Sequence, residues 1–190
     1  MKKSKWIMLI AALLPLALFF FPMWNIKLEA PQYPDSIGMN IWINKITDQN
    51  PNDIKNINLL NHYVGMKYIP EQMEEFELFP LVVGIMSFLG VIVVFTGKKY
   101  AYLGWGIVMV GLGIAGLYDF YIWEYNYGHD LDPMAAIKIP GQGYQPPLIG
   151  SKMILNFKAT SLPMLGGYLL FAGIALSFIA FYIEKKFSKK

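Results

Sequence analysis

Four long apolar stretches alternate with polar segments along this chain. They cover residues 6–24, 79–96, 100–117 and 162–183, and none has a charged residue inside it. Each approaches the roughly 20 residues that a helix needs to cross about 30 Å of hydrocarbon. They also lack the polar face, repeating every 3.6 residues, of a half-buried soluble helix. The pattern therefore predicts four transmembrane helices.

The lysines indicate how these helices are oriented. The two tails and the short connection between the second and third stretches hold nine lysines and one acid, whereas the two long connections hold seven lysines and twelve acids. Lysine-rich segments stay in the cytoplasm, which predicts both termini inside and both long segments outside. A secretory signal peptide is the alternative for residues 6–24, but that run is longer than an h-region of roughly 7–15 residues and lacks an Ala-x-Ala cleavage pattern. The nine lysines are Lys2, Lys3, Lys5, Lys98, Lys99, Lys185, Lys186, Lys189 and Lys190.

The predicted fold class is an all-α membrane protein, a bundle of four transmembrane helices with N-in/C-in topology and two extracytoplasmic segments. Residues 1–24 form the cytoplasmic tail and the first helix, and residues 25–78 the first extracytoplasmic segment. Residues 79–117 hold the second helix, a short cytoplasmic turn and the third helix. Residues 118–161 form the second extracytoplasmic segment, and 162–190 the fourth helix with its basic tail. This organisation predicts a multi-pass protein of a bacterial cytoplasmic (inner) membrane.

The two polar segments carry local structural signals. Residues 39–43 alternate in polarity, which predicts a short strand. Asn52 with Asp53 favours the start of a helix that ends at Gly65. Residues 70–77 predict a second helical stretch that leads into the second span, and the prolines and glycines of 139–147 predict an ordered loop.

Composition limits the chemistry that the polar segments can perform. All 16 basic residues are lysines, so the chain lacks the bidentate guanidinium group best suited to phosphate. The net charge of +3 therefore gives no support for binding nucleic acid. The chain has no cysteine, which excludes disulfides and thiolate ligands and leaves histidine and methionine for any soft metal.

Both histidines lie in the predicted extracytoplasmic segments, and each precedes a methionine. His62 is followed by Met66 and His129 by Met134, with Met73 on the same side of the membrane. Imidazole and thioether ligands together suit Cu(I), and a helix that continued through Met66 would place it on the same face as His62. The predicted metal ligands are therefore these five residues, with copper as the metal. The alternative is that the methionines fill apolar gaps and His62 only makes a hydrogen bond.

Carboxylates offer two further possibilities. A group of acids before the second span, Glu71 to Glu77, together with Asp130 and Asp132, could bind a hard cation or simply form a solvated surface. Asp119 and Glu124 follow the third span, where a buried carboxylate is costly and often marks an ion or proton path. The alternative places both at the membrane interface among neighbouring aromatic residues.

The known catalytic fingerprints are missing from this sequence. It contains no Walker A, Gly-x-Ser-x-Gly, His-Glu-x-x-His or dinucleotide-binding motif, so we expect no enzyme and name no catalytic residue. The spans also lack charged groups, which disfavours a small-solute permease.

Three segments carry a resemblance to known sequences. They run from Leu60 to Lys67 (LNHYVGMK), from Tyr118 to Pro133 and from Tyr144 to Gly150 (YQPPLIG). Together they resemble an uncharacterised family of small membrane proteins, found mainly in Bacteroidetes, that are encoded beside a lipoprotein copper chaperone and the maturation factors of nitrous oxide reductase. The resemblance implies a setting, the maturation of a copper enzyme at the cytoplasmic membrane, and no residue roles.

The sequence therefore favours a non-enzymatic accessory membrane protein for copper handling or copper-enzyme maturation on the extracytoplasmic face. Its expected partners are the lipid bilayer and a copper chaperone or subunits of a membrane complex, and nucleic acid is not expected. The alternative is a structural or assembly subunit that binds no metal. In that case Trp123, Tyr125, Tyr127 and Tyr144 would anchor a protein interface, because such residues are enriched at interface hot spots.

Overall fold

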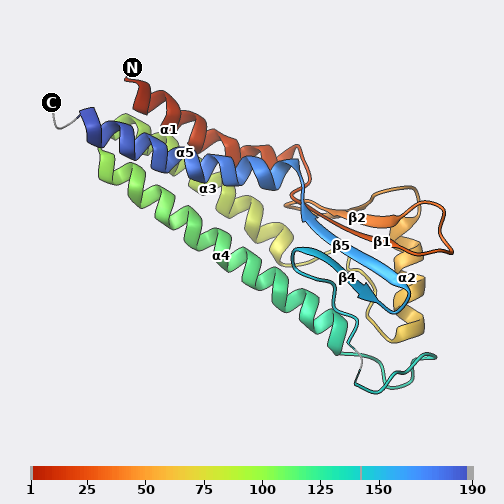
Figure 1. Ribbon diagram of the computed structural model, residues 1–190. Helices are drawn as coiled ribbons and strands as arrows, with labels where there is room; N and C mark the ends of the chain where they lie inside the picture. Colours follow the sequence, from red (N-terminus) through yellow and green to blue (C-terminus); the bar gives the residue numbers. More distant parts are fainter. Residues whose placement is uncertain (1, 142, 188–190) are drawn as a thin grey trace.

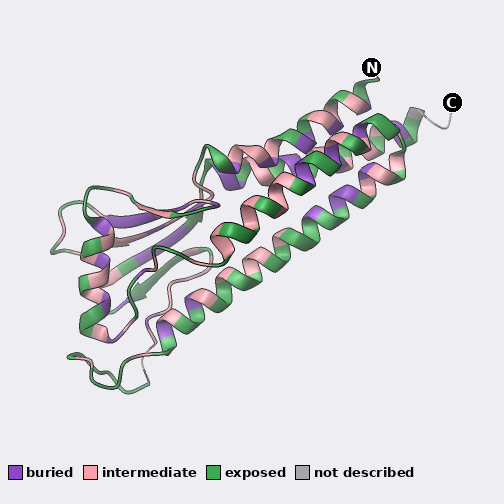
Figure 2. Cartoon of the chain, turned by 180° about the vertical axis from the view of Figure 1, so that it is seen from behind, coloured by how far each residue is buried: buried purple, intermediate pink, exposed green. Residues whose placement is uncertain are grey.

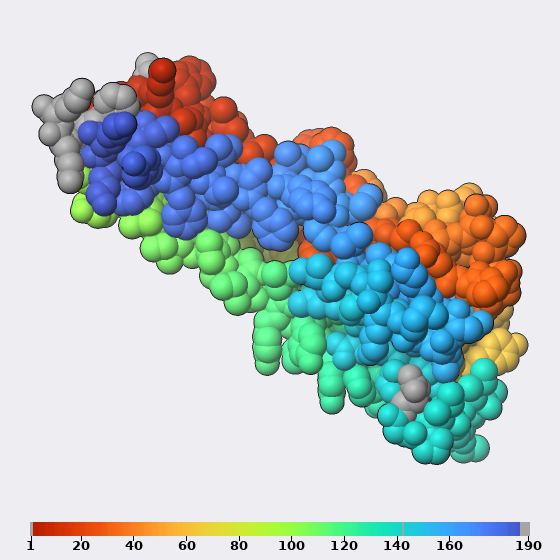
Figure 3. Space-filling model, viewed as in Figure 1, coloured from red at the N-terminus to blue at the C-terminus, as the bar shows by residue number. Residues whose placement is uncertain are grey.

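The molecule has two parts, a bundle of long helices and a wider head at one end of the bundle (Figure 1, Figure 3). The computed structural model describes residues 2–141 and 143–187. Gln142 of the predicted 139–147 loop lies outside the described residues, as do Lys189 and Lys190 of the basic tail. The fold is built from five α-helices, one 3₁₀ helix and five strands within the described residues.

Three of the described helices are long and apolar enough to cross a membrane. They are α3 (Glu75–Thr96), α4 (Lys99–His129) and α5, whose spanning part is Leu165–Lys186, with mean hydropathies of 2.7, 1.6 and 1.9. Large apolar side chains on the outer surface of α3 are strongly exposed, including Phe88 at 67% and Phe95 at 78% (Figure 2). Exposing so much apolar surface to water is unfavourable, whereas contact with lipid is not, and this is consistent with a membrane protein.

The predicted first span is built differently. It starts as α1 (Lys3–Leu13) and changes at Pro15 into the 3₁₀ helix η1 (Leu14–Phe19), because proline has no N–H to donate within the helix. With about 1.5 Å per residue in α1 and about 2.0 Å in η1, the two together are about 28 Å long. This length approaches the roughly 30 Å of a bilayer's hydrocarbon core.

The lysine clusters meet at the end of the bundle opposite the head. Lys2 Nζ lies 2.8 Å from Glu184 Oε1, which joins the N-terminus to the end of α5 (Leu165–Phe187). The Ser4 hydroxyl also donates to Glu184, and Lys5 Nζ donates to the Phe95 carbonyl oxygen at 3.5 Å. The start of α1 and the end of α5 lie at this end (Figure 1). The arrangement is the one that the lysine pattern predicts for a cytoplasmic face.

The head contains a five-stranded antiparallel sheet, so the predicted all-α fold class is wrong and the chain is mixed α/β. The strand order is β3-β2-β1-β5-β4. The strands are β1 (Trp24–Glu29), β2 (Ile37–Ile41), β3 (Ile46–Asp48), β4 (Gly150–Ile154) and β5 (Phe157–Pro163).

The sheet unites the two polar segments because of where its central strands begin and end. β1 follows η1 almost directly and β5 leads into α5, and the two helical stretches pack against each other. Strands that extend from neighbouring helices lie side by side, and β1 pairs with β5 from Trp24–Pro163 to Glu29–Lys158. Both strands are short, and this central pairing joins one polar segment to the other, so neither segment read alone reveals it.

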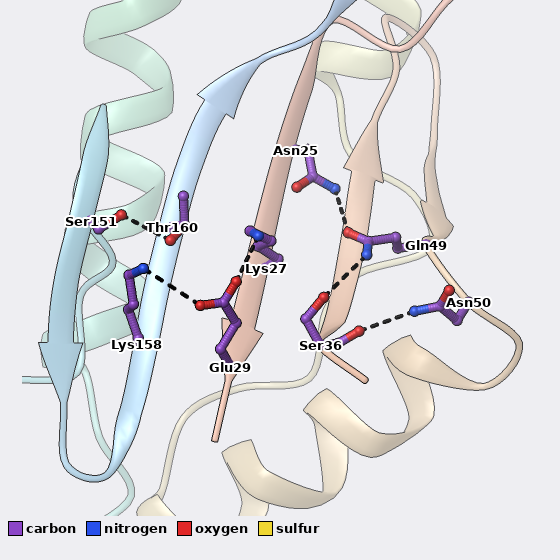
Figure 4. Close-up of polar contacts among 9 residues, drawn as sticks. All are labelled: Asn25, Lys27, Glu29, Ser36, Gln49, Asn50, Ser151, Lys158 and Thr160. Carbon is purple, nitrogen blue, oxygen red and sulfur yellow. Dashed lines mark hydrogen bonds and ion pairs between the residues drawn. The ribbon is translucent and has the colours of Figure 1, made fainter. Parts of the chain in front are cut away.

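The two faces of the sheet differ in polarity. In β1, Trp24 and Ile26 are buried against the helices, while Lys27 and Glu29 lie on the outer face. Lys27 Nζ is 2.6 Å from one Glu29 oxygen and Lys158 Nζ is 3.5 Å from the other (Figure 4). The hydrogen bond and charge of Lys27, with the charge of Lys158, hold the pKa of Glu29 below its ordinary value. This alternation turns the apolar face of the sheet inward.

Helix α2 (Asp53–Val64) covers that apolar face and confirms the predicted helix ending at Gly65, whose φ is +82°. Asp53 is 3% exposed, and its Oδ2 accepts the backbone N–H groups of Gly38 and Asn50, both at 2.9 Å. Because Gly38 belongs to β2, this carboxylate attaches the start of α2 to the sheet.

Two other local predictions needed adjustment. The strand expected at residues 39–43 is present as β2, but it begins and ends two residues earlier. The helix expected over 70–77 begins only at Glu75, from which it continues as α3 into the predicted second span.

Helix α4 continues well beyond the predicted third span. Its 31 residues correspond to about 46 Å, more than the hydrocarbon thickness of about 30 Å. Residues 100–117 are the part predicted to span the membrane. The remainder, Tyr118–His129, is helical and lies along the head, where Phe120, Trp123 and Tyr127 pack against the core of the sheet.

Candidate functional site

A cavity of about 300 Å³ lies inside the head, between the sheet, α2 and the outer end of α4. Ile26 and Met39 contribute from the sheet, Leu60 from α2 and Ile154 from the β4–β5 hairpin, so most of its lining is apolar. The one acidic side chain in this lining, among the described residues, is Glu124 of α4. Small-molecule sites commonly have this character, an apolar concavity with a few polar groups.

The pattern of side chains along each element explains the lining. Ile57, Leu60, Asn61 and Val64 are spaced three and four residues apart on α2 and therefore share the helix face that meets the cavity. Ile26 of β1 lines the cavity because its strand points alternate side chains inward.

Glu124 is fully buried, at 0% exposed, in the part of α4 beyond the membrane span. Neither of its carboxylate oxygens has a hydrogen-bond partner among the described residues. Burial away from water raises the pKa of Glu124 from its ordinary value of 4.5 to about 8, because the charged form loses its hydration. The carboxyl is therefore mostly protonated and neutral at pH 7. We call this group the cavity carboxyl.

Aromatic side chains flank the cavity carboxyl on α4. The rings of Trp123 and Tyr127 lie 4.6 Å apart between centroids, and both residues line the cavity. The Tyr127 hydroxyl donates to the backbone oxygen of Tyr68, and burial raises the pKa of Tyr127 to about 12. Tyr127 therefore stays a neutral phenol whose hydroxyl is already used within the fold.

A close backbone contact holds the loop that forms another wall. The Tyr144 N–H donates to the Gly128 carbonyl at 2.9 Å, and Tyr144, 3% exposed, lines the cavity. A Cβ on Gly128 would lie only 2.3 Å from the backbone nitrogen of Gln145. Glycine at position 128 thus allows the loop to approach α4 closely enough to enclose the cavity.

The structure separates the predicted metal ligands His62 and Met66. Helix α2 ends at Val64 and the chain reverses at Gly65, so Met66 lies outside the helix. Met66 lines the cavity, whereas His62 is exposed on α2. His62 and Met66 therefore do not share a helical face, which was the predicted geometry for this pair of ligands.

The other predicted ligands lie at different places in the head. His129 ends α4, with its ring stacked on Tyr125 at 4.1 Å and its Nδ1 2.9 Å from the Tyr125 carbonyl oxygen. Met134 is 84% exposed, and Met73 is half-buried just before α3. Over residues 2–141 and 143–187, no three His, Asp or Glu side chains gather in a group that could hold a metal.

The segments that carry the two histidines are nevertheless neighbours. Lys67 Nζ lies 2.6 Å from Asp130 Oδ2, and the Asp132 N–H donates to the Gly65 carbonyl at 2.8 Å. The Ile137 N–H also donates to the Tyr63 carbonyl, at 2.9 Å. The end of α2 and the segment after α4 are therefore attached to each other.

The sequence predicts the same two alternatives for Asp119 and Glu124, either an ion or proton path or a place at the membrane interface. Asp119 is exposed and Glu124 is buried, and a periodic signal separates the two. Leu117, Phe120, Glu124 and Tyr127 recur at intervals of three and four residues, so Glu124 occupies a position on the apolar face of the helix. The cavity itself gives no such signal, because its walls come from two helices, four strands and the loops between them.

No protein-family model matches this chain, and no curated protein matches it either.

Proposed function

We propose that this protein is a membrane-anchored binding protein whose head holds a small apolar ligand on the extracytoplasmic side of a bacterial cytoplasmic membrane. The observation that carries the proposal is the cavity of about 300 Å³ with its fully buried carboxyl. Protein interiors are close-packed, and a buried carboxyl normally has a partner. A bound molecule would supply both the missing contacts and the missing partner.

The arrangement of the chain supports the proposed orientation. The lysine clusters lie at one end of the bundle and the head lies at the other (Figure 1). Because the natural chain has no cysteine, single cysteines can test the topology directly. In spheroplasts, a membrane-impermeant maleimide should label Asp35→Cys in the head and leave Lys98→Cys unlabelled until the membrane is opened. The reverse labelling would contradict the orientation.

The lining favours binding over catalysis. Of the predicted polar candidates, His62 and His129 both lie outside the cavity lining, so neither supplies an acid or base to the cavity carboxyl. General acid–base chemistry requires such a group within hydrogen-bond reach of the reacting atoms. The proposed protein is therefore a carrier, sensor or accessory subunit.

A pair of neighbouring leucines provides the test of the cavity. Leu60 lines the cavity, whereas Leu59 is 53% exposed on the same helix. The protein in lipid nanodiscs is titrated with phenethyl alcohol, a small neutral apolar probe, and empty nanodiscs serve as the blank. Saturable binding that is lost in Leu60→Trp and kept in Leu59→Trp is expected. Binding that is absent from the natural protein, or unchanged by filling the cavity, would refute the proposal.

Copper handling, directly or by docking a copper chaperone, is our second proposed function. It rests on the resemblance described above and on the attachment of the His62 segment to the His129 segment through Lys67 and Asp130. A Cu(I) titration under reducing conditions tests it. The expected result is stoichiometric binding that weakens when His62 and His129 are both replaced by alanine. No binding above background, together with a stably co-purifying protein, would favour the assembly-subunit alternative.

A further inference from the structure

We infer that the ligand of the cavity is a small apolar molecule with one basic nitrogen, whose ammonium group is held by Glu124 beside the aromatic side chains of Trp123 and Tyr127. This inference rests on the proposed binding function and names the chemical class of its ligand. It follows from the charge, the burial and the neighbours of the cavity carboxyl.

The charges around the cavity exclude an anionic ligand. None of the described residues that line it is a lysine or a histidine, and Glu124 is its single acid. An anion would enter an apolar site without any countercharge, at a large cost in desolvation. A cation meets the opposite situation, since the cavity carboxyl accepts hydrogen bonds through both oxygens once it is ionised.

A neutral ligand uses only part of what the cavity carboxyl offers. Glu124 is 0% exposed and both of its oxygens are unpartnered among the described residues, and a neutral carboxyl donates one hydrogen bond and accepts others without any gain from charge. An ammonium group offers three donors and a full charge, and charge-assisted hydrogen bonds are about twice as strong as neutral ones. The buried carboxyl is therefore best matched by an amine.

The aromatic residues favour the same ligand. Trp123 and Tyr127 precede and follow Glu124 on α4, and their ring centroids are 4.6 Å apart. Cations are attracted to the faces of such rings, most strongly where water is excluded. Because the Tyr127 hydroxyl already donates to Tyr68, this residue contributes its ring to the cavity. Aromatic rings are a recurring means of recognising ammonium ions.

Binding should be accompanied by the release of a proton. The carboxyl is mostly protonated in the empty cavity, and the amine enters as an ammonium ion from water. The carboxyl O–H proton passes to the solvent and an ammonium–carboxylate pair forms, so charge and protons balance. The other titratable groups that line the cavity are the phenols of Tyr63 on α2, Tyr127 on α4 and Tyr144 of the loop, and no further carboxylate, lysine or histidine of the described residues lines it.

Three probes of matched shape and different charge test the inference. Phenethylamine, phenethyl alcohol and hydrocinnamate are titrated calorimetrically into the natural protein, Glu124→Gln and Asp119→Asn in lipid nanodiscs. Asp119 is an exposed carboxylate on the same helix and provides the control. We expect the natural protein and Asp119→Asn to bind the amine about tenfold or more tightly than the alcohol, and Glu124→Gln to lose this preference. Glutamine keeps the shape of the side chain and removes its charge, so the alcohol should lose much less affinity for the variant than the amine does.

The dependence of the binding heat on the ionisation enthalpy of the buffer gives a second measurement that needs no variant. Release of close to one proton at pH 7 when the amine binds supports the pairing with Glu124. Equal binding of amine and alcohol, or a preference for hydrocinnamate, overturns the inference and leaves the proposed binding function standing. If none of the three probes binds, the proposed function fails as well.

Discussion

The burial of Glu124 makes a specific prediction about stability. The carboxyl is 0% exposed, and burial raises its pKa from 4.5 to about 8. Between these two values the folded protein keeps a proton on Glu124 that the unfolded chain has already released. Stability depends on pH through this difference in bound protons, so the free energy of unfolding must fall as the pH rises. Below about pH 4.5 both states are protonated and the cost vanishes.

The size of the effect follows from the two pKa values. Each pH unit within the window costs about 1.4 kcal/mol, so a rise from about pH 5.5 to about pH 7.5 lowers the free energy of unfolding by roughly 2.5 kcal/mol. For a chain of this size that corresponds to a fall in Tm of about 5 to 10 °C. Glu124→Gln has no proton to lose at this position, so we expect its Tm to exceed that of the natural protein at both pH values, by about 5 to 10 °C more at pH 7.5 than at pH 5.5.

Tryptophan fluorescence during thermal unfolding in lipid nanodiscs measures both Tm values, because Trp24 and Trp123 lie in the head. The difference between the natural protein and Glu124→Gln isolates this carboxyl. Other groups, such as Glu29 with its lowered pKa, contribute equally to both proteins. Asp35→Asn removes an exposed carboxylate from the head and should follow the natural protein. Parallel pH profiles for the natural protein and Glu124→Gln would refute the reasoning, since they would show that Glu124 titrates alike in both states.

Two further predictions concern how the head is held together. Gly128→Ala places a Cβ 2.3 Å from the backbone nitrogen of Gln145, which must move, so we expect a loss of about 2 kcal/mol and weaker binding of the cavity probe. Gly116→Ala on the same helix meets nothing within 4 Å and should leave both unchanged; equal effects of the two substitutions would contradict the close approach. Asp53→Ala leaves the buried N–H of Gly38 and the part-buried N–H of Asn50 without their acceptor and should cost about 2–3 kcal/mol in thermal unfolding of the head, because charged hydrogen bonds of this kind are worth about that much. Asp35→Ala, which removes an exposed carboxylate, should cost far less, and a similar loss for both would show that Asp53 does not attach α2 to the sheet.

The sequence by itself determined the features that depend on local composition. The lengths of the apolar stretches predict the long helices, and the lysines at their ends predict that these ends lie on one side. Both signals can be read from the sequence because each depends only on the composition of one segment. Asp53 and Gly65 likewise mark the ends of α2, since helix ends depend on a few neighbouring residues.

The tertiary structure alone decided what the polar segments become. Trp24–Glu29 and Phe157–Pro163 form strands because the helices that precede β1 and follow β5 pack together, which brings two short and distant segments into register. That same sheet buries one face of the outer end of α4. Because of this burial Glu124 is enclosed, whereas Asp119, the other acid that follows the predicted span, stays exposed. The turn at Gly65 separates His62 on α2 from Met66 in the cavity lining. Strand pairing and burial are non-local, because they depend on which elements meet in space, and the sequence of one segment does not contain that information.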